Sequence, residues 1–287
     1  MNVADALKKA TSRLCRIPDI EHPRMEAEAL LASILQKDRL WLYLNHLKEL
    51  PLDLVERYEE VTMRRLNGEP LAYITGRKEF WSLYFEVTRD TLIPRPETEL
   101  IIETALSILT SDSNRPMRIL DLGSGSGVLA ISLLYELPCI TAIATDISYG
   151  ALLVARRNAE RNGVASRISF IQADWLSAFK ENSPYFDMIV SNPPYVALNV
   201  KDALPRDITA YEPHTALFSG MDGLKDISRL ITGCPNVLKT GGWLLCEIGW
   251  NQEEAVIRMV EESNRYMNIK MLRDYSGNAR VLAAMKS

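Results

Sequence analysis

The sequence predicts an α/β protein, in which a mostly parallel sheet carries helices on both faces and a small all-helical domain precedes it. Residues 1–75 repeat apolar positions at helical spacing and show no strand pattern. From about residue 118, short apolar runs alternate with helical runs, as expected for a parallel sheet whose crossovers are helices. A glycine-rich turn follows the first of these runs, and sheets of this kind bind ligands at the carboxyl ends of their strands.

The length and composition are typical of a soluble globular protein with two domains. The chain has 287 residues, of which 47% are hydrophobic and 24% are charged. No stretch approaches the ~18 consecutive apolar residues that a membrane-spanning helix needs. The start, "MNVADALKKATSRL", predicts an amphipathic helix and lacks the apolar centre of a signal peptide. We therefore expect a cytoplasmic protein with no membrane partner.

The cysteines and the net charge argue against several classes of function. With three histidines and no C-x-x-C pair, the four widely spaced cysteines predict neither a metal site nor a disulfide framework: Cys15, Cys139, Cys234 and Cys246. The formal net charge is −4. Because a protein that binds a nucleic-acid backbone usually carries a basic surplus, we expect no direct nucleic-acid partner, although a local basic patch is compatible with this charge.

Residues 1–75 are expected to form the helical N-terminal domain. Apolar residues fall at helical spacing near the start (Ala6, Leu7, Ala10 and Leu14), "MEAEALLASIL" repeats the pattern, and "LDLVERYEEVTMRRLNGEP" ends on Gly68 and Pro70, as helices do. Up to Glu69 the segment has 11 Lys and Arg against 12 Asp and Glu, which does not suit a nucleic-acid-binding arm. A packing module and a domain that docks a protein substrate both remain open.

The pattern changes after Tyr73. "YITGRKEFWSLYFEVT" mixes aromatic and β-branched residues with a glycine and predicts a hairpin, so we assign residues 76–96 to a hairpin and linker. "DTLIPRPETELIIETALSILT" then predicts a helix with Pro96 in its first turn and acidic residues against the positive end of its dipole. The main domain is expected to comprise residues 97–287.

The main domain is expected to contain seven strands. Five strand-like runs are "RILDLG", "ITAIATD", "ISFIQAD", "YFDMIVSN" and "WLLCEIG". Helical runs separate most of them: "GVLAISLLYEL", "GALLVARRNAERNG" and "GLKDISRLITGCPNVLKTGG". The final "IKMLRDYSGNARVLAAMK" predicts two more strands joined by a Gly-Asn turn.

The turn "LDLGSGSGVL" after the first strand is the first candidate binding segment. Its glycines let the backbone pass close to a ligand. A dinucleotide fingerprint would need a third glycine at the position of Val128. G-x-G-x-G with Asp121 two residues ahead instead resembles the pattern of S-adenosylmethionine-dependent methyltransferases. We therefore predict cofactor contacts from Gly123, Ser124, Gly125, Ser126 and Gly127, while a turn for another nucleotide, or for no ligand, remains open.

Acidic residues end the next two strands as well. Asp146 ends the second strand, where a carboxylate can accept both hydroxyls of a ribose, although it could instead cap the next helix. After the third strand, Asp174 can accept from an adenine amino group and Trp175 can offer a flat face to the ring, although a core tryptophan is the plain alternative. The order of these signals along the chain favours methyl transfer over hydride transfer.

The fourth strand ends in "NPPY", residues Asn192, Pro193, Pro194 and Tyr195, beside the place where the reactive end of the cofactor would lie. The side-chain carbonyl of Asn192 and the backbone carbonyl of Pro193 are two acceptors that suit a planar NH₂ group, and Tyr195 can pack on its face. The prolines hold these acceptors in a rigid, extended path. We predict that all four residues bind the substrate, that all but Pro194 are catalytic, and that Asn192 also borders the cofactor.

This chemistry predicts an amino or amide N-methyltransferase and leaves adenine, cytosine, guanine and a glutamine amide open as acceptors. The lone pair of such a nitrogen is conjugated, so acceptors on both of its hydrogens return electron density to it. The motif has no base that titrates near neutral pH, since tyrosine titrates at about 10. The surplus proton is therefore expected to leave after transfer.

Several longer segments resemble the peptide chain release factor N5-glutamine methyltransferase family over nearly the whole chain. They are "GEPLAYITGRKEFWSLYFEV", "LIPRPETE", "DLGSGSG", "DIS", "NPPY", "YEPHTALFSGMDGL" and "EIGWNQ". "PRPETE" and "EPHTALFSGMDGL" are not shared by methyltransferases in general. The resemblance implies a Rossmann-like class I methyltransferase fold, S-adenosylmethionine as cofactor and class 1 peptide chain release factors as protein substrates.

The resemblance also assigns roles to residues. It implies that the glutamine of a Gly-Gly-Gln loop is methylated, with Gly123 to Gly127, Asp146 and Trp175 on the cofactor and Asn192 to Tyr195 on the glutamine. Ser124 stands where the family often has threonine, a change expected to be harmless. Two alternatives remain open: methylation of a ribosomal-protein glutamine or of an exocyclic amine of DNA or RNA, and a catalytically silent cofactor-binding protein.

Overall fold

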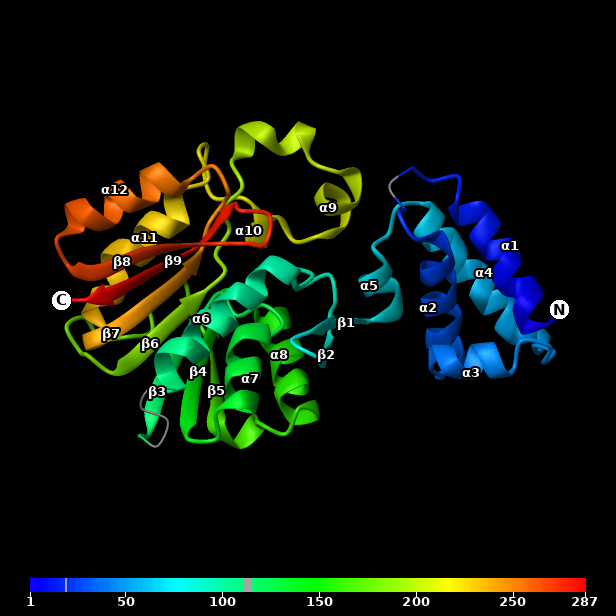
Figure 1. Ribbon diagram of the computed structural model, residues 1–287, viewed down its shortest axis with the longest axis horizontal. Helices are drawn as coiled ribbons and strands as arrows, with labels where there is room; N and C mark the ends of the chain where they lie inside the picture. The colour runs from blue at the N-terminus through cyan, green and yellow to red at the C-terminus, as the bar shows by residue number, and fades with distance from the viewer. Residues whose placement is uncertain (19, 111–114) are drawn as a thin grey trace. The chain divides into compact units, whose positions relative to one another are not determined.

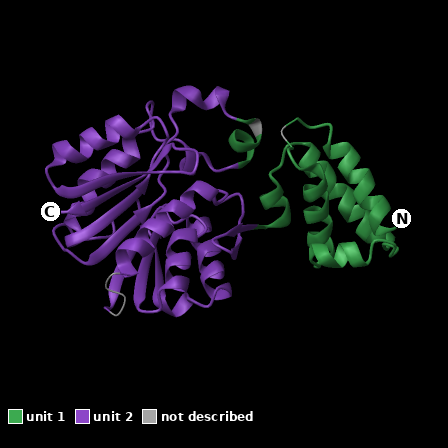
Figure 2. Ribbon diagram, viewed as in Figure 1, with its two compact units in different colours: residues 1–77, 205–211 green, residues 78–204, 212–287 purple. Residues whose placement is uncertain are grey.

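The computed structural model describes residues 1–18, 20–110 and 115–287. The chain forms two compact units, drawn in different colours in Figure 2. The first unit comprises residues 1–77 and 205–211, and the second comprises residues 78–204 and 212–287. The return of residues 205–211 to the first unit is a long-range feature that no pattern in the sequence indicates.

The first unit is built from helices, which confirms the predicted helical N-terminal domain. They are α1 (Val3–Leu14), α2 (Pro23–Leu35), α3 (Arg39–Leu44), α4 (Leu52–Leu66), α5 (Leu71–Thr75) and α9 (Arg206–Tyr211). The side chain of Asn2 accepts from the backbone N–H of Asp5 at 2.8 Å, so α1 begins with a capped first turn. Tyr58 on α4 is buried and donates to the carbonyl of Ala27 at 2.9 Å, which joins α4 to α2.

The predicted hairpin lies within residues 76–96. Strands β1 (Arg77–Phe80) and β2 (Leu83–Glu86) form a two-stranded sheet. Trp81 and Ser82 between them both have left-handed backbone conformations, with φ of 50° and 56°. Because the two-residue turns that match the twist of paired strands need positive φ, this geometry is the one expected for a tight hairpin.

The second unit contains a seven-stranded sheet in the order β5-β4-β3-β6-β7-β9-β8 (Figure 1). Neighbouring strands from β5 to β7 pair in parallel, and β9 runs antiparallel to β7 and β8. The strands are β3 (Met117–Leu122), β4 (Ile140–Asp146), β5 (Ile168–Gln172), β6 (Phe186–Ser191), β7 (Leu238–Glu247), β8 (Tyr266–Arg273) and β9 (Ala279–Lys286). The mostly parallel sheet of seven strands is confirmed.

Helices cover both faces of this sheet (Figure 1). The helical segments are η1 (Pro96–Thr98), α6 (Glu99–Leu109), α7 (Val128–Glu136), α8 (Tyr149–Arg161), η3 (Ala165–Arg167), η4 (Leu198–Ala203), α10 (His214–Leu217), α11 (Lys225–Gly233), η5 (Cys234–Asn236) and α12 (Glu253–Ser263). Within the residues that the structure describes, no helix is long and apolar enough to cross a membrane.

Each face of the sheet has its own apolar core. Residues of α6 and α7 pack with Ile119 of β3 and Val190 of β6 on one face. Residues of α11 and α12 pack with Leu120 and Ile189, the neighbours of those two residues, on the other face. Successive side chains of a strand point to opposite faces, so strands buried on both sides are mostly apolar along their length, as "RILDL" and "FDMIV" are apart from their charged residues.

The strand order reverses between β3 and β6. The chain moves from β3 to β4 and β5 on one side, and then returns past β3 to place β6 on the other side. At such a reversal the helical connections leave in opposite directions and open a crevice at the carboxyl ends of the strands. The glycine-rich turn follows β3 and "NPPY" follows β6, so the fold brings the two predicted segments to this crevice.

Candidate active site

A cavity of about 350 Å³ lies at the carboxyl ends of the strands, within the second unit. It is lined by residues of all four predicted segments: Gly123, Ser124, Gly125, Ser126, Asp146, Asp174, Trp175, Asn192 and Pro194. Its size suits a small-molecule site. Three other predicted site residues, Gly127, Pro193 and Tyr195, belong to the same segments but are not among the lining residues.

Two further segments line the cavity and were not predicted from local patterns. Asp90, Leu92, Pro94 and Thr98 come from the stretch between β2 and α6, and a second group comprises Thr215, Ala216, Phe218, Asp226 and Arg229. The available signal was the resemblance of "LIPRPETE" and "YEPHTALFSGMDGL" to one family, because both segments contribute here.

The glycine-rich turn bends tightly between β3 and α7. Gly123, Gly125 and Gly127 have φ of 70°, 54° and 83°, in the left-handed region that residues with a Cβ rarely adopt. A Cβ on Gly125 would meet no protein atom within 4 Å, whereas one on Gly127 would lie 2.8 Å from Ile131 Cδ1. Gly125 therefore leaves space beside the backbone for a ligand, and Gly127 allows α7 to pack.

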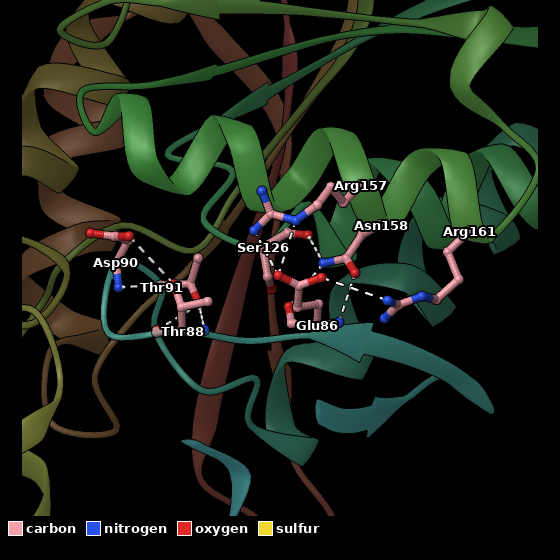
Figure 3. A network of polar contacts seen from close by, with 8 residues as sticks. All are labelled: Glu86, Thr88, Asp90, Thr91, Ser126, Arg157, Asn158 and Arg161. Carbon is pink, nitrogen blue, oxygen red and sulfur yellow. Dashed lines mark hydrogen bonds and ion pairs between the residues drawn. The ribbon is translucent and has the colours of Figure 1, made fainter. Parts of the chain in front are cut away.

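Asn158 on α8 anchors this turn to β2 (Figure 3). Asn158 is buried, and its Nδ2 donates to the carbonyls of Ser126 and Glu86, both at 2.9 Å. Its Oδ1 accepts from the N–H of Glu86 at 2.7 Å. The Glu86 carboxylate in turn accepts from Nε and Nη2 of Arg157 at 3.0 and 2.6 Å. These contacts fix the start of the stretch that contributes Asp90 to the cavity.

Asp146 ends β4 in the wall of the cavity and supports the glycine-rich turn. Its Oδ2 accepts from the N–H of Gly125 and its Oδ1 from the N–H of Ser148, both at 2.8 Å. The side chain of Ser148, and not Asp146, caps α8 by accepting from the N–H of Ala151. Burial raises the pKa of Asp146, and the backbone hydrogen bonds oppose this shift. Each carboxylate oxygen keeps a further lone pair for a ligand hydroxyl.

Trp175 and Asp174 form the wall of the cavity after β5. Trp175 has a φ of 51°, and its ring lies 3.3 Å from the position that a Cβ on Gly123 would take. Its Nε1 donates to Asp226 at 3.0 Å, which fixes the ring. Asp174 is half-exposed and accepts from Arg229 at 2.8 Å, and this hydrogen bond lowers the pKa of Asp174. Asp174 is therefore a charged acceptor at the rim.

Asn192 follows β6, and Thr98 orients its carboxamide. Asn192 Nδ2 donates to Thr98 Oγ1 at 3.0 Å. Within the described residues, neither Asn192 Oδ1 nor the carbonyl of Pro193 accepts a hydrogen bond. Ser191, the last residue of β6, donates to the carbonyl of Leu122 at 2.7 Å and ties the ends of β6 and β3 together. Asn192, in the cavity wall, and Pro193, the next residue, thus each keep an acceptor without a protein donor.

A buried carboxylate, that of Glu247 at the end of β7, lies behind Asn192. Glu247 Oε2 accepts from Thr98 Oγ1 at 2.7 Å, and its Oε1 accepts from the hydroxyl of Tyr195 at 3.2 Å. Burial raises the pKa of Glu247 to about 7, although both hydrogen bonds oppose the shift. The ring of Tyr195 packs against the core on the α11 and α12 face. Its hydroxyl therefore contacts the buried carboxylate.

Gln252 holds the far end of "NPPY". Its Nε2 donates to the carbonyls of Tyr195 and Gly223 at 3.0 and 3.2 Å, and its Oε1 accepts from the N–H of Gly249 at 2.8 Å. Gly223 has a φ of 78°, and a Cβ there would lie 2.2 Å from the carbonyl oxygen of Tyr195. The glycine of "GMDGL" and the glutamine of "EIGWNQ" therefore both set the path of "NPPY".

An ion pair joins the two remaining segments that line the cavity. Arg95 pairs with Glu212, whose other oxygen accepts from the N–H of Ile93 at 3.2 Å. Glu212 is 4% exposed, so its carboxylate is buried, whereas the Arg95 side chain is partly exposed. The contact connects the stretch that supplies Pro94 to the stretch that supplies Thr215.

Among the residues that the structure describes, no group of three or more His, Cys, Asp or Glu side chains is arranged to hold a metal ion. The cysteines are free thiols, two of them buried (Cys234 and Cys246) and two exposed (Cys15 and Cys139).

The sheet order, the glycine-rich turn after β3 and "NPPY" at the switch point define a Rossmann-like class I methyltransferase. The N-terminal domain of human METTL16, solved in complex with SAH, has the same fold. The TM-score is 0.54 over 89% of this chain and 93% of that chain, at 17% identity.

The sequence comparisons define the family. Residues 5–76 match the family described as PrmC N-terminal domain, and residues 98–210 match the methyltransferase small domain. The release factor glutamine methyltransferase of Cereibacter sphaeroides is 40% identical over 285 residues, 99% of this chain and 98% of the relative. That of Salmonella typhimurium is 39% identical over 268 residues, 93% of each protein. The chain belongs to the release factor glutamine methyltransferase family, as its motifs predicted.

Proposed function

We propose that this protein transfers a methyl group from S-adenosylmethionine to the side-chain amide nitrogen, N5, of the glutamine in the Gly-Gly-Gln loop of class 1 peptide chain release factors. The observation that carries the proposal is the pair of unpartnered acceptors, Asn192 Oδ1 and the carbonyl of Pro193, at the end of β6. Two acceptors suit the two hydrogens of a primary amide. Membership of the release factor glutamine methyltransferase family supports the choice of glutamine.

The cavity has groups that fit S-adenosylmethionine. Ser124 Oγ lines the cavity, is buried and has no hydrogen-bond partner among the described residues. The open space beside Gly125 admits a ligand against the backbone, and Asp146 keeps lone pairs for ribose hydroxyls. Trp175 and Asp174 are proposed to take the adenine ring and its amino group. S-adenosylmethionine, when bound, supplies a methyl group on a sulfonium sulfur.

The residues of "NPPY" are proposed to align and activate the glutamine amide. Asn192 and the Pro193 carbonyl accept from its two N–H groups and return electron density to the nitrogen, and the stiff prolines keep these acceptors in place. With the cofactor bound, these residues would hold the amide nitrogen in line with the methyl group that the sulfonium supplies. The sulfur would keep the bonding pair as a neutral thioether, and one N–H proton would leave the methylated amide afterwards. Holding two reactants in line contributes roughly 7–11 kcal/mol to such a reaction.

The helical domain, residues 1–75, is proposed to dock the release factor, with residues 76–96 as a linker to the methyltransferase domain of residues 97–287. A glutamine side chain is too small to specify one protein. On and just after α3, four apolar side chains are 63–78% exposed: Leu40, Tyr43, Leu44 and Leu47. Exposed apolar clusters are typical of protein-binding surfaces. We propose a cytoplasmic enzyme that makes no direct nucleic-acid contact.

Mass spectrometry of release factors after incubation with the enzyme and S-adenosylmethionine tests this function. The expected result is one added methyl group on the loop glutamine. A release factor with asparagine at that position is the matched control, because it keeps an amide but moves it by one methylene group. Methylation of ribosomal proteins or of oligonucleotides, with unmodified release factor in parallel reactions, would contradict the proposal.

A further inference from the structure

We infer that Thr98 and Glu247 are positioning residues, which orient the Asn192 carboxamide so that its oxygen, and not its NH₂ group, is presented to the substrate amide. This inference rests on the proposed function. The contacts form one chain: Asn192 Nδ2 to Thr98 Oγ1 at 3.0 Å, and Thr98 Oγ1 to Glu247 Oε2 at 2.7 Å. Three segments meet in it, because Thr98 ends η1, Asn192 follows β6 and Glu247 ends β7.

The direction of this chain follows from what each group can donate. An ionised carboxylate only accepts hydrogen bonds, so when Glu247 is ionised the single hydroxyl proton of Thr98 goes to Glu247. Thr98 Oγ1 is then left only with lone pairs on the side of Asn192. The carboxamide must therefore turn its donor nitrogen toward Thr98, which places Oδ1 at the opposite end.

Orientation matters because the two ends of a carboxamide have opposite chemistry. With Nδ2 toward the substrate, two NH₂ groups would face each other without an acceptor between them. The amide nitrogen of the glutamine would then lose one of the two acceptors that raise its electron density. A flipped Asn192 keeps its size and its place in the cavity wall, so the chemical step should be slowed far more than cofactor binding.

Burial leaves the protein side chains as the groups that can set this orientation. Thr98 and Glu247 are each 1% exposed, so water has almost no access to replace either partner. The other groups that act on the Glu247 carboxyl are the Tyr195 hydroxyl, which donates to it at 3.2 Å, Arg280 of β9 and Glu97 of η1. Burial has the largest effect on Glu247 and disfavours its ionised form, as Glu97 also does, whereas the hydrogen bonds to the carboxyl and the charge of Arg280 favour that form.

The test compares Thr98→Val, which removes the hydroxyl at nearly constant volume, with Thr98→Ser, which keeps it. Thr104→Val on α6 is the matched control, because that hydroxyl donates only to the carbonyl of Leu100, at 2.7 Å, among the described residues. Methyl transfer to whole release factor is measured in a single turnover with saturating cofactor, and S-adenosylmethionine affinity is measured by calorimetry. Thr98→Val is also combined with Asn192→Ala.

Thr98→Val is expected to slow transfer about 10- to 100-fold, the effect of one lost buried hydrogen bond, with cofactor affinity unchanged. Thr98→Ser and Thr104→Val should keep near-normal rates. In the Asn192→Ala background, Thr98→Val should add less than about a twofold effect, since it acts through a side chain that is already absent. In Glu247→Gln the glutamine NH₂ group can donate to Thr98, so the Asn192 carboxamide can turn around. This variant should also slow transfer, and it provides a test even if Thr98→Val does not fold.

Normal transfer by Thr98→Val or by Glu247→Gln would overturn the inference. So would a full, additive loss when Thr98→Val is combined with Asn192→Ala, because the threonine would then act independently of the asparagine. These outcomes differ from a failure of the proposed function itself, in which the unmodified enzyme would transfer no methyl group to release factor. That result would contradict both the proposed function and the positioning role of Thr98 and Glu247.

Discussion

Replacing Glu247 with glutamine is expected to change the way in which stability depends on pH. Burial raises the pKa of Glu247 from 4.5 to about 7 in the folded protein. A shift of this size corresponds to about 3 kcal/mol in the free energy of unfolding. Glutamine has nearly the same shape, keeps a hydrogen-bonding group at each end and does not titrate, so the variant removes mainly the ionisation.

The sign follows from counting protons. Below pH 4.5 the carboxyl is protonated in both the folded and the unfolded chain. Between pH 4.5 and about 7 the unfolded chain releases this proton while the folded chain keeps it, so the contribution of Glu247 to stability falls as the pH rises. Above pH 7 both states are ionised and the loss is complete. The Glu247→Gln variant should therefore become progressively more stable relative to the parent protein from pH 5 to pH 8.

Denaturant unfolding at several pH values between 5 and 8 measures this difference. Subtracting the parent protein from the variant at each pH cancels the other titrating groups, including Asp121, whose pKa burial also raises to about 7. Glu262→Gln, on the exposed side of α12, is the control for removing a carboxyl without burial and should give a flat difference. A flat difference for Glu247→Gln as well would refute the reasoning, because it would mean that the carboxyl has the same pKa in both states.

Four further variants test the site and the docking domain. Asp146→Ala should weaken S-adenosylmethionine binding about tenfold or more in calorimetry and leave release factor binding intact; unchanged cofactor affinity would leave the residue a purely structural role. Asn192→Ala should raise the activation free energy of single-turnover methyl transfer by about 1–3 kcal/mol or more, with the cofactor still bound. A near-normal rate would mean that "NPPY" is only a stiff turn. Gly223→Ala should lower the free energy of unfolding by about 1–3 kcal/mol, because its Cβ meets a backbone carbonyl at a left-handed position; thermal unfolding equal to the parent would contradict this. Tyr43→Ser with Leu44→Ser should lower kcat/KM on whole release factor without changing cofactor affinity, and equal activity would make the helical domain a packing module.

Surface substitution is the better test of docking because of how the first unit is built. Residues 205–211 belong to this unit, and the hydroxyl of Tyr211 donates to the carbonyl of Asn67 at 3.3 Å. Removing residues 1–75 would leave this segment without its packing partners. A truncated protein could then lose activity through misfolding, whereas exposed side chains can be changed without disturbing the core.

Much of the fold could be predicted because its determinants are local. The central strands of the parallel sheet, β3 and β6, are buried on both faces and are therefore mostly apolar, and the crossovers have helical periodicity. The glycines of the turn after β3 have left-handed backbones, so the residue type itself marks the turn. The return of residues 205–211 had no such signal, since a short polar helix far from its partners along the chain looks like any other loop segment.

In the candidate site, too, some features could be predicted from the sequence and others could not. Asn192 and Pro193 could be selected because the chemistry of an acceptor is a property of the residue, and their place after a strand follows from the periodicity. Which end of the Asn192 carboxamide faces the substrate cannot be read from the residue type. It depends on Thr98, 94 positions earlier, and through it on Glu247, which is 149 positions from Thr98. Both lie in motifs that mark the family, "PRPETE" and "EIGWNQ", but a motif does not say which atom bonds to which.

A buried carboxylate at Glu247 lowers stability, but it gives the hydrogen bonds between Glu247, Thr98 and Asn192 a single direction. A neutral partner at the position of Glu247 could both donate and accept, so Thr98 and Asn192 could adopt either direction of hydrogen bonding with little difference in energy. An ionised carboxylate accepts only, and it removes this choice. Ionisation of Glu247 in the folded protein, near pH 7, is the event that fixes the acceptor toward the substrate. By that pH the stability contributed by the protonated carboxyl has been lost, because the unfolded chain ionises from pH 4.5 upward. The less stable charge state and the best-ordered active site therefore lie on the same side of one titration.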